Sequence, residues 1–174
     1  MNTITYSYLN IRDKKHLQKG IELYKEIRND PYGYGKFLYN FTEEGLTELL
    51  RASECLGAWD GEELVGLGIL VLDKEDKGIN NTHRDLLKLE SKTSMAELGF
   101  YVHFNYCNKG IAKTLAEKLM NYAREININI ITATAHAENK PSIRLLTHQE
   151  FVFVTEYIRG DGDKRNLYRK MLTL

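Results

Sequence analysis

The stretch Val102-His103-Phe104-Asn105-Tyr106-Cys107-Asn108-Lys109-Gly110-Ile111-Ala112-Lys113 decides the fold of this 174-residue chain. It marks the passage from a predicted strand into a predicted helix. The first N–H groups of a helix have no partner inside it, and the helix dipole adds positive charge there. Such an end binds phosphate, and Gly110 leaves room for close backbone approach. On spacing alone, an ordinary strand-to-helix turn with a solvated basic face remains the favoured interpretation.

Alternating strands and helices surround this stretch. Residues 14–28 and 110–126 repeat apolar side chains at helical spacing, and Asp60-Gly61 is typical of a tight hairpin turn. Residues 73–93 are polar and uneven, typical of an insertion or loop, with a helix expected around 83–90. Strands are expected at 4–9, 55–59, 64–72, 95–104, 128–135, 151–158 and 166–172, and further helices at 42–53 and 139–149. The pattern predicts an α/β protein with a central mixed sheet and helices on both faces, as a single domain over residues 1–174.

Composition excludes several function classes. The 24 basic and 24 acidic residues give a net charge of zero, which argues against a nucleic-acid coat. No stretch reaches about 18 apolar residues, and residues 1–10 lack the pattern of a secretion signal, so a cytoplasmic protein without a membrane partner is expected. Two cysteines make no disulfide framework, and the five histidines show no metal-binding spacing. No metal is expected. Walker and dinucleotide-binding glycine motifs are also absent.

Three segments together resemble the GNAT superfamily of acyl-CoA-dependent N-acetyltransferases. The family signature Arg/Gln-x-x-Gly-x-Gly/Ala is similar to Cys107-Asn108-Lys109-Gly110-Ile111-Ala112. The preceding strand, residues 96–102, is similar to the family's fourth strand. The helix that opens at Asn139 and leads to Phe151 is similar to a later family helix. The resemblance is strong for residues 95–151 and extends loosely over the chain.

The resemblance implies a GNAT fold and acetyl transfer from acetyl-CoA, the acyl-donor cosubstrate, to a primary amine. It implies direct attack in a ternary complex. It assigns the thioester oxygen to a backbone N–H near Val102 and the pantetheine region to Asn139 and Ser142. The implied cofactor-binding residues are Tyr101, Val102, Cys107, Asn108, Lys109, Gly110, Ile111, Ala112, Lys113, Asn139 and Ser142.

Glu97 is the candidate general base, because family members often carry a carboxylate on this strand that acts through water. An ion pair at a sheet edge is an equally weighted alternative. Leu146 stands where many members carry a tyrosine that protonates the leaving thiolate, and Tyr101 and Tyr157 are the candidate replacements. His103 is expected to cap the loop. An acyl-cysteine at Cys107 is disfavoured, because no His–Asp pattern accompanies it.

Local charge predicts the kind of acceptor. Residues 30–63 hold eight acidic and two basic side chains, whereas residues 103–124 hold four basic and one acidic. The acidic segment would attract a small cationic amine or a peptide amine. Its aromatic residues either line that site or pack the first helices. A non-catalytic acyl-CoA sensor of the same fold and an interaction protein without CoA remain alternatives, and a homodimer is left open.

Overall fold

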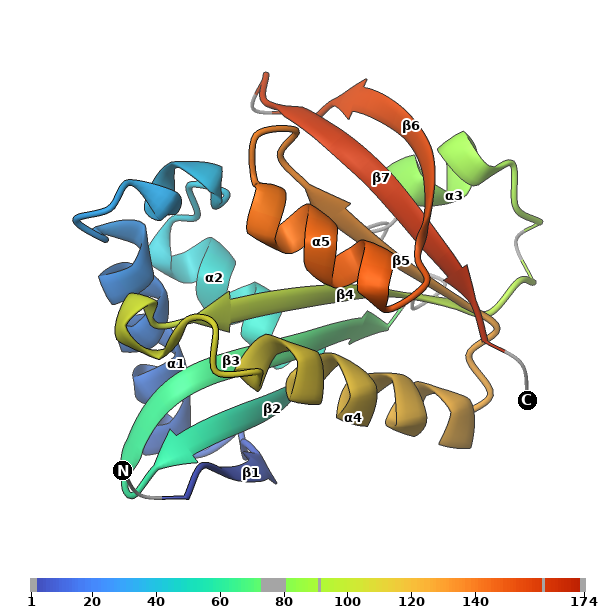
Figure 1. Cartoon of the computed structure of the whole chain (residues 1–174). Helices are drawn as coiled ribbons and strands as arrows, with labels where there is room; N and C mark the ends of the chain where they lie inside the picture. Colours follow the sequence, from blue (N-terminus) through green and yellow to red (C-terminus); the bar gives the residue numbers. More distant parts are fainter. Residues whose placement is uncertain (1–2, 73–80, 91, 161, 173–174) are drawn as a thin grey trace. The chain divides into compact units, whose positions relative to one another are not determined.

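The computed structural model describes residues 3–72, 81–90, 92–160 and 162–172. Within these residues, seven strands form one mixed sheet in the order β1-β2-β3-β4-β5-β7-β6. The chain divides into two compact units, residues 1–71 with 99–119, and residues 72–98 with 120–174 (Figure 1). Strand β4 (Met95–Val102) and helix α4 (Ile111–Glu125) each continue from one unit into the other. The single domain over 1–174 stays a prediction.

The first unit begins with β1 (Thr5–Tyr8) and α1 (Lys14–Arg28), which starts at Asp13, whose side chain accepts a hydrogen bond from the Lys15 N–H. A short 3₁₀ helix η1 (Tyr34–Phe37) leads to α2 (Glu43–Arg51), capped by Thr42. Strands β2 (Ser53–Asp60) and β3 (Glu63–Leu72) form the expected antiparallel hairpin. The 3₁₀ helix η2 (Phe104–Tyr106) follows β4 in the chain.

The faces of β3 explain where α4 begins. Leu67, Ile69 and Val71 of β3 pack in the apolar cluster with side chains of α1 and α2. Gly66 and Gly68 alternate with them, and a Cβ at either would lie within 3 Å of a side chain of α4, Ile111 or Leu119. Two glycines therefore let α4 pack closely on β3, which positions the start of α4.

The second unit contains α3 (Asn81–Leu87), β5 (Ile130–Ala135), α5 (Lys140–His148), β6 (Val152–Ile158) and β7 (Lys164–Met171). β5 pairs in parallel with the first half of β4 and antiparallel with β7, which pairs with β6. Helix α5 ends in a left-handed residue, Glu150, at φ 60°. The N–H groups of Glu150 and Phe151 donate to Thr147 and Leu146, closing the turn that a glycine usually makes.

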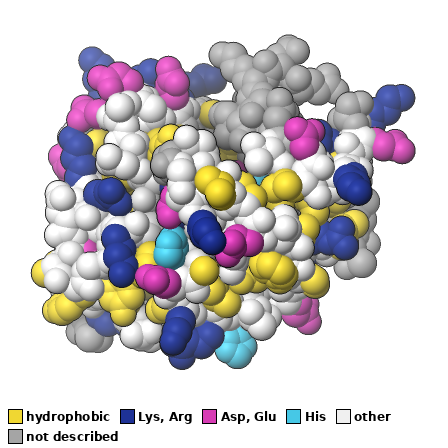
Figure 2. Space-filling view, turned by 90° about the horizontal axis from the view of Figure 1, so that it is seen from above, with side chains coloured by type: hydrophobic (Ala, Val, Ile, Leu, Met, Phe, Trp, Pro, Cys, Tyr) yellow, Lys and Arg dark blue, Asp and Glu magenta, His cyan; other side chains and the backbone are white. Residues whose placement is uncertain are grey.

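The predicted α/β class, mixed sheet and flanking helices are confirmed, with end shifts of a few residues. The expected strand 95–104 ends at Val102, because Phe104–Tyr106 winds into η2. Helix α3 covers Asn81–Leu87 instead of 83–90, and residues 73–80 lie outside the described part of the chain. No helix in that described part is long and apolar enough to cross a membrane. On the face shown in Figure 2, hydrophobic side chains lie in separate patches among charged ones.

Candidate functional site

The loop between β4 and α4 presents unpaired backbone donors. Cys107 to Gly110 are exposed, and Asn108 and Gly110 take left-handed conformations at φ 60° and 79°. The Gly110 carbonyl accepts the Thr114 N–H, so α4 begins there. Among the described backbone hydrogen bonds, none uses the N–H groups of residues 108–113. A Cβ at Gly110 would meet nothing within 4 Å. This open helix start can hold a diphosphate through main-chain donors.

Contacts within the first unit hold this loop in place. The N–H of His103 donates to Val65 of β3 at 2.9 Å, and its Nδ1 accepts the Asn105 N–H at 3.3 Å. His103 therefore caps the loop, as expected. The Tyr106 hydroxyl donates to Asp60 at 3.0 Å, and this hydrogen bond raises the pKa of Tyr106. The loop is thus tied to both strands of the β2–β3 hairpin.

Lys109 and Lys113, in the loop and in the first turn of α4, each contact a neighbouring side chain. Lys109 Nζ lies 4.5 Å from the centre of the Tyr106 ring, and Lys113 lies 3.8 Å from Glu117 on the next turn of α4. Cys107 stands where the resembling family carries Arg or Gln. Partial burial and Asp30 raise the pKa of its thiol, so Cys107 is a neutral thiol near pH 7. Backbone donors, more than side-chain cations, characterise this helix start.

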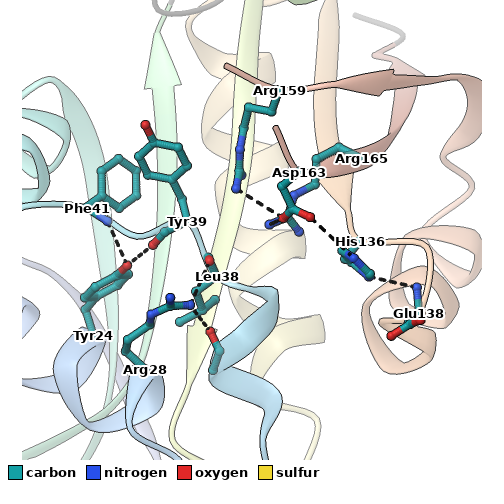
Figure 3. A network of polar contacts seen from close by, with 11 residues as sticks. Tyr24, Arg28, Leu38, Tyr39, Phe41, His136, Glu138, Arg159, Asp163 and Arg165 are labelled. Atoms are coloured by element: carbon teal, nitrogen blue, oxygen red, sulfur yellow. Dashed lines mark hydrogen bonds and ion pairs between the residues drawn. The ribbon is translucent and has the colours of Figure 1, made fainter. Parts of the chain in front are cut away.

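Tyr101 and Val102 end β4 just before this loop, and both are half-buried. The Tyr101 ring packs edge-on against the Tyr24 ring of α1, with centroids 5.7 Å apart. The Tyr24 hydroxyl donates to the Tyr39 carbonyl, and Arg28 of the same helix donates to the Leu38 carbonyl at 3.1 Å (Figure 3). The Phe41 ring contacts Tyr24 of α1, with centroids 5.9 Å apart, and the Tyr39 ring contacts Phe41 at 4.5 Å, so these two aromatic residues of the 30–63 segment pack together.

The acidic segment also divides into structural and exposed residues. Asp30 is 8 % exposed and accepts the N–H groups of Tyr32, Tyr34 and Gly35, so it closes a loop. Glu43 pairs with Lys25 of α1 at 2.6 Å. Glu44, Glu48, Glu62 and Glu63 are exposed. Residues 30–63 therefore present less surface charge than the sequence count suggests, and their exposed charged side chains are still mainly acidic.

Glu97 lies in the second unit, on the part of β4 that pairs with β5. β4 is a central strand, so the sheet-edge alternative for Glu97 is wrong. Oε2 of Glu97 lies 3.7 Å from Nδ1 of His83, a contact that is an ion pair only when the imidazole is protonated. Burial raises the pKa of Glu97, while His83 and Arg159 act in the opposite direction.

His83 joins three strands of the second unit. It is 4 % exposed and lies on α3. Its Nδ1 is 3.1 Å from the Thr132 hydroxyl on β5, and its Nε2 is 3.1 Å from the Tyr157 hydroxyl on β6. The Tyr157 ring meets the imidazole edge-on, with centroids 5.8 Å apart. A carboxylate, an imidazole and a phenol are therefore brought together from distant parts of the sequence.

Sequence reasoning missed His83. It lies in the polar segment interpreted as an insertion, and neither the 49-residue separation from Thr132 nor the 74-residue separation from Tyr157 leaves a local pattern. The only signal was its place near the start of a short predicted helix. From the sequence, Tyr157 is only one of two candidate replacements for a missing acid.

Asn139 and Ser142 are brought together at the start of α5. The Asn139 side-chain oxygen accepts the Ser142 N–H at 3.2 Å, so Asn139 caps the helix. Leu146 of this helix is 2 % exposed and belongs to the core of the second unit. The position expected to carry a family tyrosine is therefore an apolar packing position here.

A charged cluster at the β6–β7 turn completes the polar groups of the second unit. Asp163 lies 3.5 Å from Arg159, 2.6 Å from Arg165 and 3.6 Å from His136 (Figure 3). Arg165 is nearly fully buried. Within the described residues, no group of three or more His, Cys, Asp or Glu side chains is arranged to hold a metal ion.

Comparison with known proteins supports the resemblance. The family model described as acetyltransferase (GNAT) family matches residues 21–151. An N-acetyltransferase of Bacillus licheniformis called p20 is 34 % identical over 84 residues, which cover 46 % of this chain. The match spans about half of that relative's length, 47 %.

Solved structures share the fold. A GNAT acetyltransferase from Streptococcus pneumoniae gives a TM-score of 0.68 at 14 % identity, covering 98 % of this chain and all of that one. The ribosomal-protein-S18-alanine N-acetyltransferase of Escherichia coli gives 0.70 at 13 %, covering 99 % and 96 %. Arabidopsis thaliana NAA60, solved with acetyl-CoA, gives 0.70 at 20 %, covering 98 % and 99 %. The signature loop, the fold and a family match over most of the sequence agree, and the chain belongs to the acetyltransferase (GNAT) family.

Proposed function

We propose that the protein transfers the acetyl group of acetyl-CoA to a primary amine by direct attack in a ternary complex. The observation that carries the proposal is the exposed start of α4, where the N–H groups of residues 108–113 make no described backbone hydrogen bond. Cys107, Asn108, Lys109, Gly110, Ile111, Ala112 and Lys113 would hold the diphosphate. Main-chain donors need no particular side chain, so Cys107 in place of Arg or Gln is compatible with this role.

Acetyl transfer needs three further functions: a donor for the thioester oxygen, contacts for the pantetheine arm and a proton acceptor for the amine. Val102, with Tyr101 beside it, supplies the first in this proposal. Asn139 and Ser142 supply the second, with the Asn139 Nδ2 hydrogens available because its Oδ1 caps α5. Glu97 is the general base. Direct attack is favoured over an acyl-cysteine, since the raised pKa of Cys107 disfavours a thiolate.

The acceptor in this proposal is a small cationic amine or a peptide amine. The exposed carboxylates Glu44, Glu48, Glu62 and Glu63 of the first unit support it, because acidic surfaces raise the encounter rate with cations. With added salt, kcat/KM for a diamine, which carries two positive charges, should fall more steeply than kcat/KM for a monoamine of similar size, which carries one. Equal salt dependence of the two kcat/KM values would contradict electrostatic steering by these carboxylates.

The test combines binding and turnover. Acetyl-CoA at about 100 times its Kd should stabilise the protein by roughly 2.7 kcal/mol, seen as a rise in Tm. Thiol release from acetyl-CoA is then measured against a panel of cationic, neutral and acidic amines. Stabilisation with thiol release for cationic amines supports the proposal. Stabilisation without release for any amine favours the acyl-CoA sensor, and no stabilisation at all contradicts both.

A further inference from the structure

We propose that the rings of Tyr32 and Phe104, with the carboxylate of Glu26 near them, bind a second positive charge on the acceptor amine. The inference rests on the proposed acetyl transfer and narrows its acceptor to amines that carry a cation away from the reacting nitrogen. All three residues belong to the first unit, as does Val102, whose N–H is the proposed donor to the thioester oxygen. They act as specificity-determining residues and take no part in the chemical step.

The Tyr32 side chain is exposed although its backbone is firmly held. Tyr32 is 71 % exposed, more than any other large hydrophobic residue in the described part of the chain. The buried Asp30 carboxylate accepts the Tyr32 N–H at 2.7 Å and also the N–H groups of Tyr34 and Gly35. Main-chain hydrogen bonds therefore fix the position of a ring that remains open to solvent. A group held in place in this way loses little entropy when it binds a ligand.

Ring contacts connect Tyr32 to the loop that follows β4. The Tyr32 ring meets the Phe104 ring edge-on, with centroids 5.8 Å apart, and the His103 ring packs on Phe104 at 4.1 Å. Phe104 comes two residues after Val102, so their Cα atoms lie within about 7 Å of each other. A cation on these rings is therefore near enough to the proposed thioester site for an alkyl chain to connect it to the reacting nitrogen.

An ammonium group of the protein itself lies on a neighbouring ring. Lys109 Nζ is 4.5 Å from the centre of the Tyr106 ring, which meets the His103 ring edge-on at 6.1 Å. Within the described residues, no lysine or arginine lies over the ring of Tyr32 or Phe104. Aromatic faces attract cations, most strongly where part of the water is removed. The Tyr32 ring can therefore bind a ligand cation as Tyr106 binds Lys109.

The carboxylate of Glu26 supplies a negative charge beside these rings. Its Oε2 lies 3.9 Å from Nε2 of His103, the residue that packs on Phe104, and its side chain is 59 % exposed. Glu26 lies in the last turns of α1, whose end leads directly into the loop that holds Tyr32. A carboxylate next to open aromatic faces favours a cationic ligand over a neutral or anionic one.

The test uses two acceptor probes of the same shape that differ by one charge. One is an ω-aminoalkyl trimethylammonium ion, and the other is its carbon analogue, which ends in a tert-butyl group. Each has one primary amine, and the spacer is long enough to give both amines the same pKa. A difference in kcat/KM for thiol release from acetyl-CoA therefore reports on the distant group alone. The wild type should prefer the cationic probe about tenfold.

Variants assign this preference to particular side chains. Tyr32→Leu should lower it to about twofold, because the ring is lost, whereas Tyr32→Phe should keep most of it. Glu26→Gln should lower it to about fivefold at low salt, and added salt should bring the wild type to the same value. The Tm of Tyr32→Leu should stay near that of the wild type, because Tyr32 is exposed.

Two matched controls separate this site from its surroundings. Tyr34→Leu removes the next exposed ring of the same loop, and Glu22→Gln removes an exposed carboxylate one turn earlier on α1. Both controls should keep the preference of the wild type. The Kd of each variant for CoA should stay within twofold of the wild-type value.

Four outcomes would overturn the proposal. They are equal kcat/KM for the two probes in the wild type, no reaction with the cationic probe although other amines react, an unchanged preference in Tyr32→Leu, or an equal loss in Tyr34→Leu. Weaker CoA binding by Tyr32→Leu with unchanged probe preference would also overturn it, because the ring would then contact the cofactor. Failure of the proposed function is distinct, since no amine would then release thiol from acetyl-CoA with the wild type.

Discussion

Nδ1 of His83 lies 3.7 Å from Oε2 of Glu97, although the two residues come from a short helix and a central strand. Glu97 is thus a partly buried carboxyl with a single nearby imidazole on one side and Arg159 acting from another. Its raised pKa has consequences for stability as well as for turnover.

Replacing Glu97 by Gln should change stability in a pH-dependent way. Burial raises the folded-state pKa of Glu97, so this group favours the folded state at acid pH and loses that contribution as pH rises through the raised pKa. The Tm of Glu97→Gln minus that of the wild type should therefore become more positive between pH 4 and pH 8. The same variant should keep acetyl-CoA binding and lose turnover. A Tm difference that falls with pH would contradict the assignment.

Gly110→Ala should weaken acetyl-CoA binding beyond its effect on stability. The left-handed φ of 79° makes alanine unfavourable by about 1 kcal/mol, and the new methyl group would occupy the open space at the start of α4. Gly162→Ala is the matched control, with φ 85° and equally open space in the β6–β7 turn. Urea unfolding should show similar losses for both, and titration with acetyl-CoA should show a rise in Kd for Gly110→Ala alone.

The two cysteines should differ sharply in reactivity. Cys55 is 2 % exposed, and burial raises its pKa to about 12. Cys107 is exposed and lies in the proposed diphosphate loop, with its pKa raised by partial burial and Asp30. Iodoacetamide should therefore label Cys107 alone, faster as the pH rises above 8, and acetyl-CoA should slow the labelling. Mass spectrometry of the native protein checks this, with Cys107→Ser as the control. Labelling unaffected by acetyl-CoA would place the diphosphate elsewhere.

Glu150→Gly should stabilise the protein. Glu150 holds the left-handed position after α5, where glycine has no steric cost. Its side chain is 86 % exposed and pairs with Lys170, whose ammonium also donates to the Gln149 carbonyl and so keeps a partner when Glu150 is replaced. A gain of about 0.5 to 1 kcal/mol in the free energy of unfolding is expected. Asn127→Gly, at φ 61° after α4, should gain less, because asparagine tolerates this conformation. If urea unfolding shows that Glu150→Gly gains no more stability than Asn127→Gly, or loses stability, the Lys170 contact outweighs the relief of the left-handed backbone strain.

Local sequence determined the elements and the loop proposed to bind the cofactor. Capping side chains such as Asp13, Thr42 and Asn139 act within a few residues, and apolar periodicity marks α1 over the exact span Lys14–Arg28. The loop from Cys107 to Lys113 is likewise contiguous, and its main-chain donors follow from a helix that starts after Gly110. Such features can be recognised from the sequence because the interacting groups are neighbours in the chain.

Only the tertiary structure decided which side chains surround Glu97. His83, Thr132 and Tyr157 lie on α3, β5 and β6, and their meeting depends on strand order and register, which pair Glu97 with Thr132 across β4 and β5. It also decided that Asp30 closes a loop while Glu44 stays in solvent. The amino-acid composition does not distinguish a buried carboxylate such as Asp30 from an exposed one such as Glu44. Burial and hydrogen bonding between distant residues set its chemistry, and those arise only when the sheet has formed.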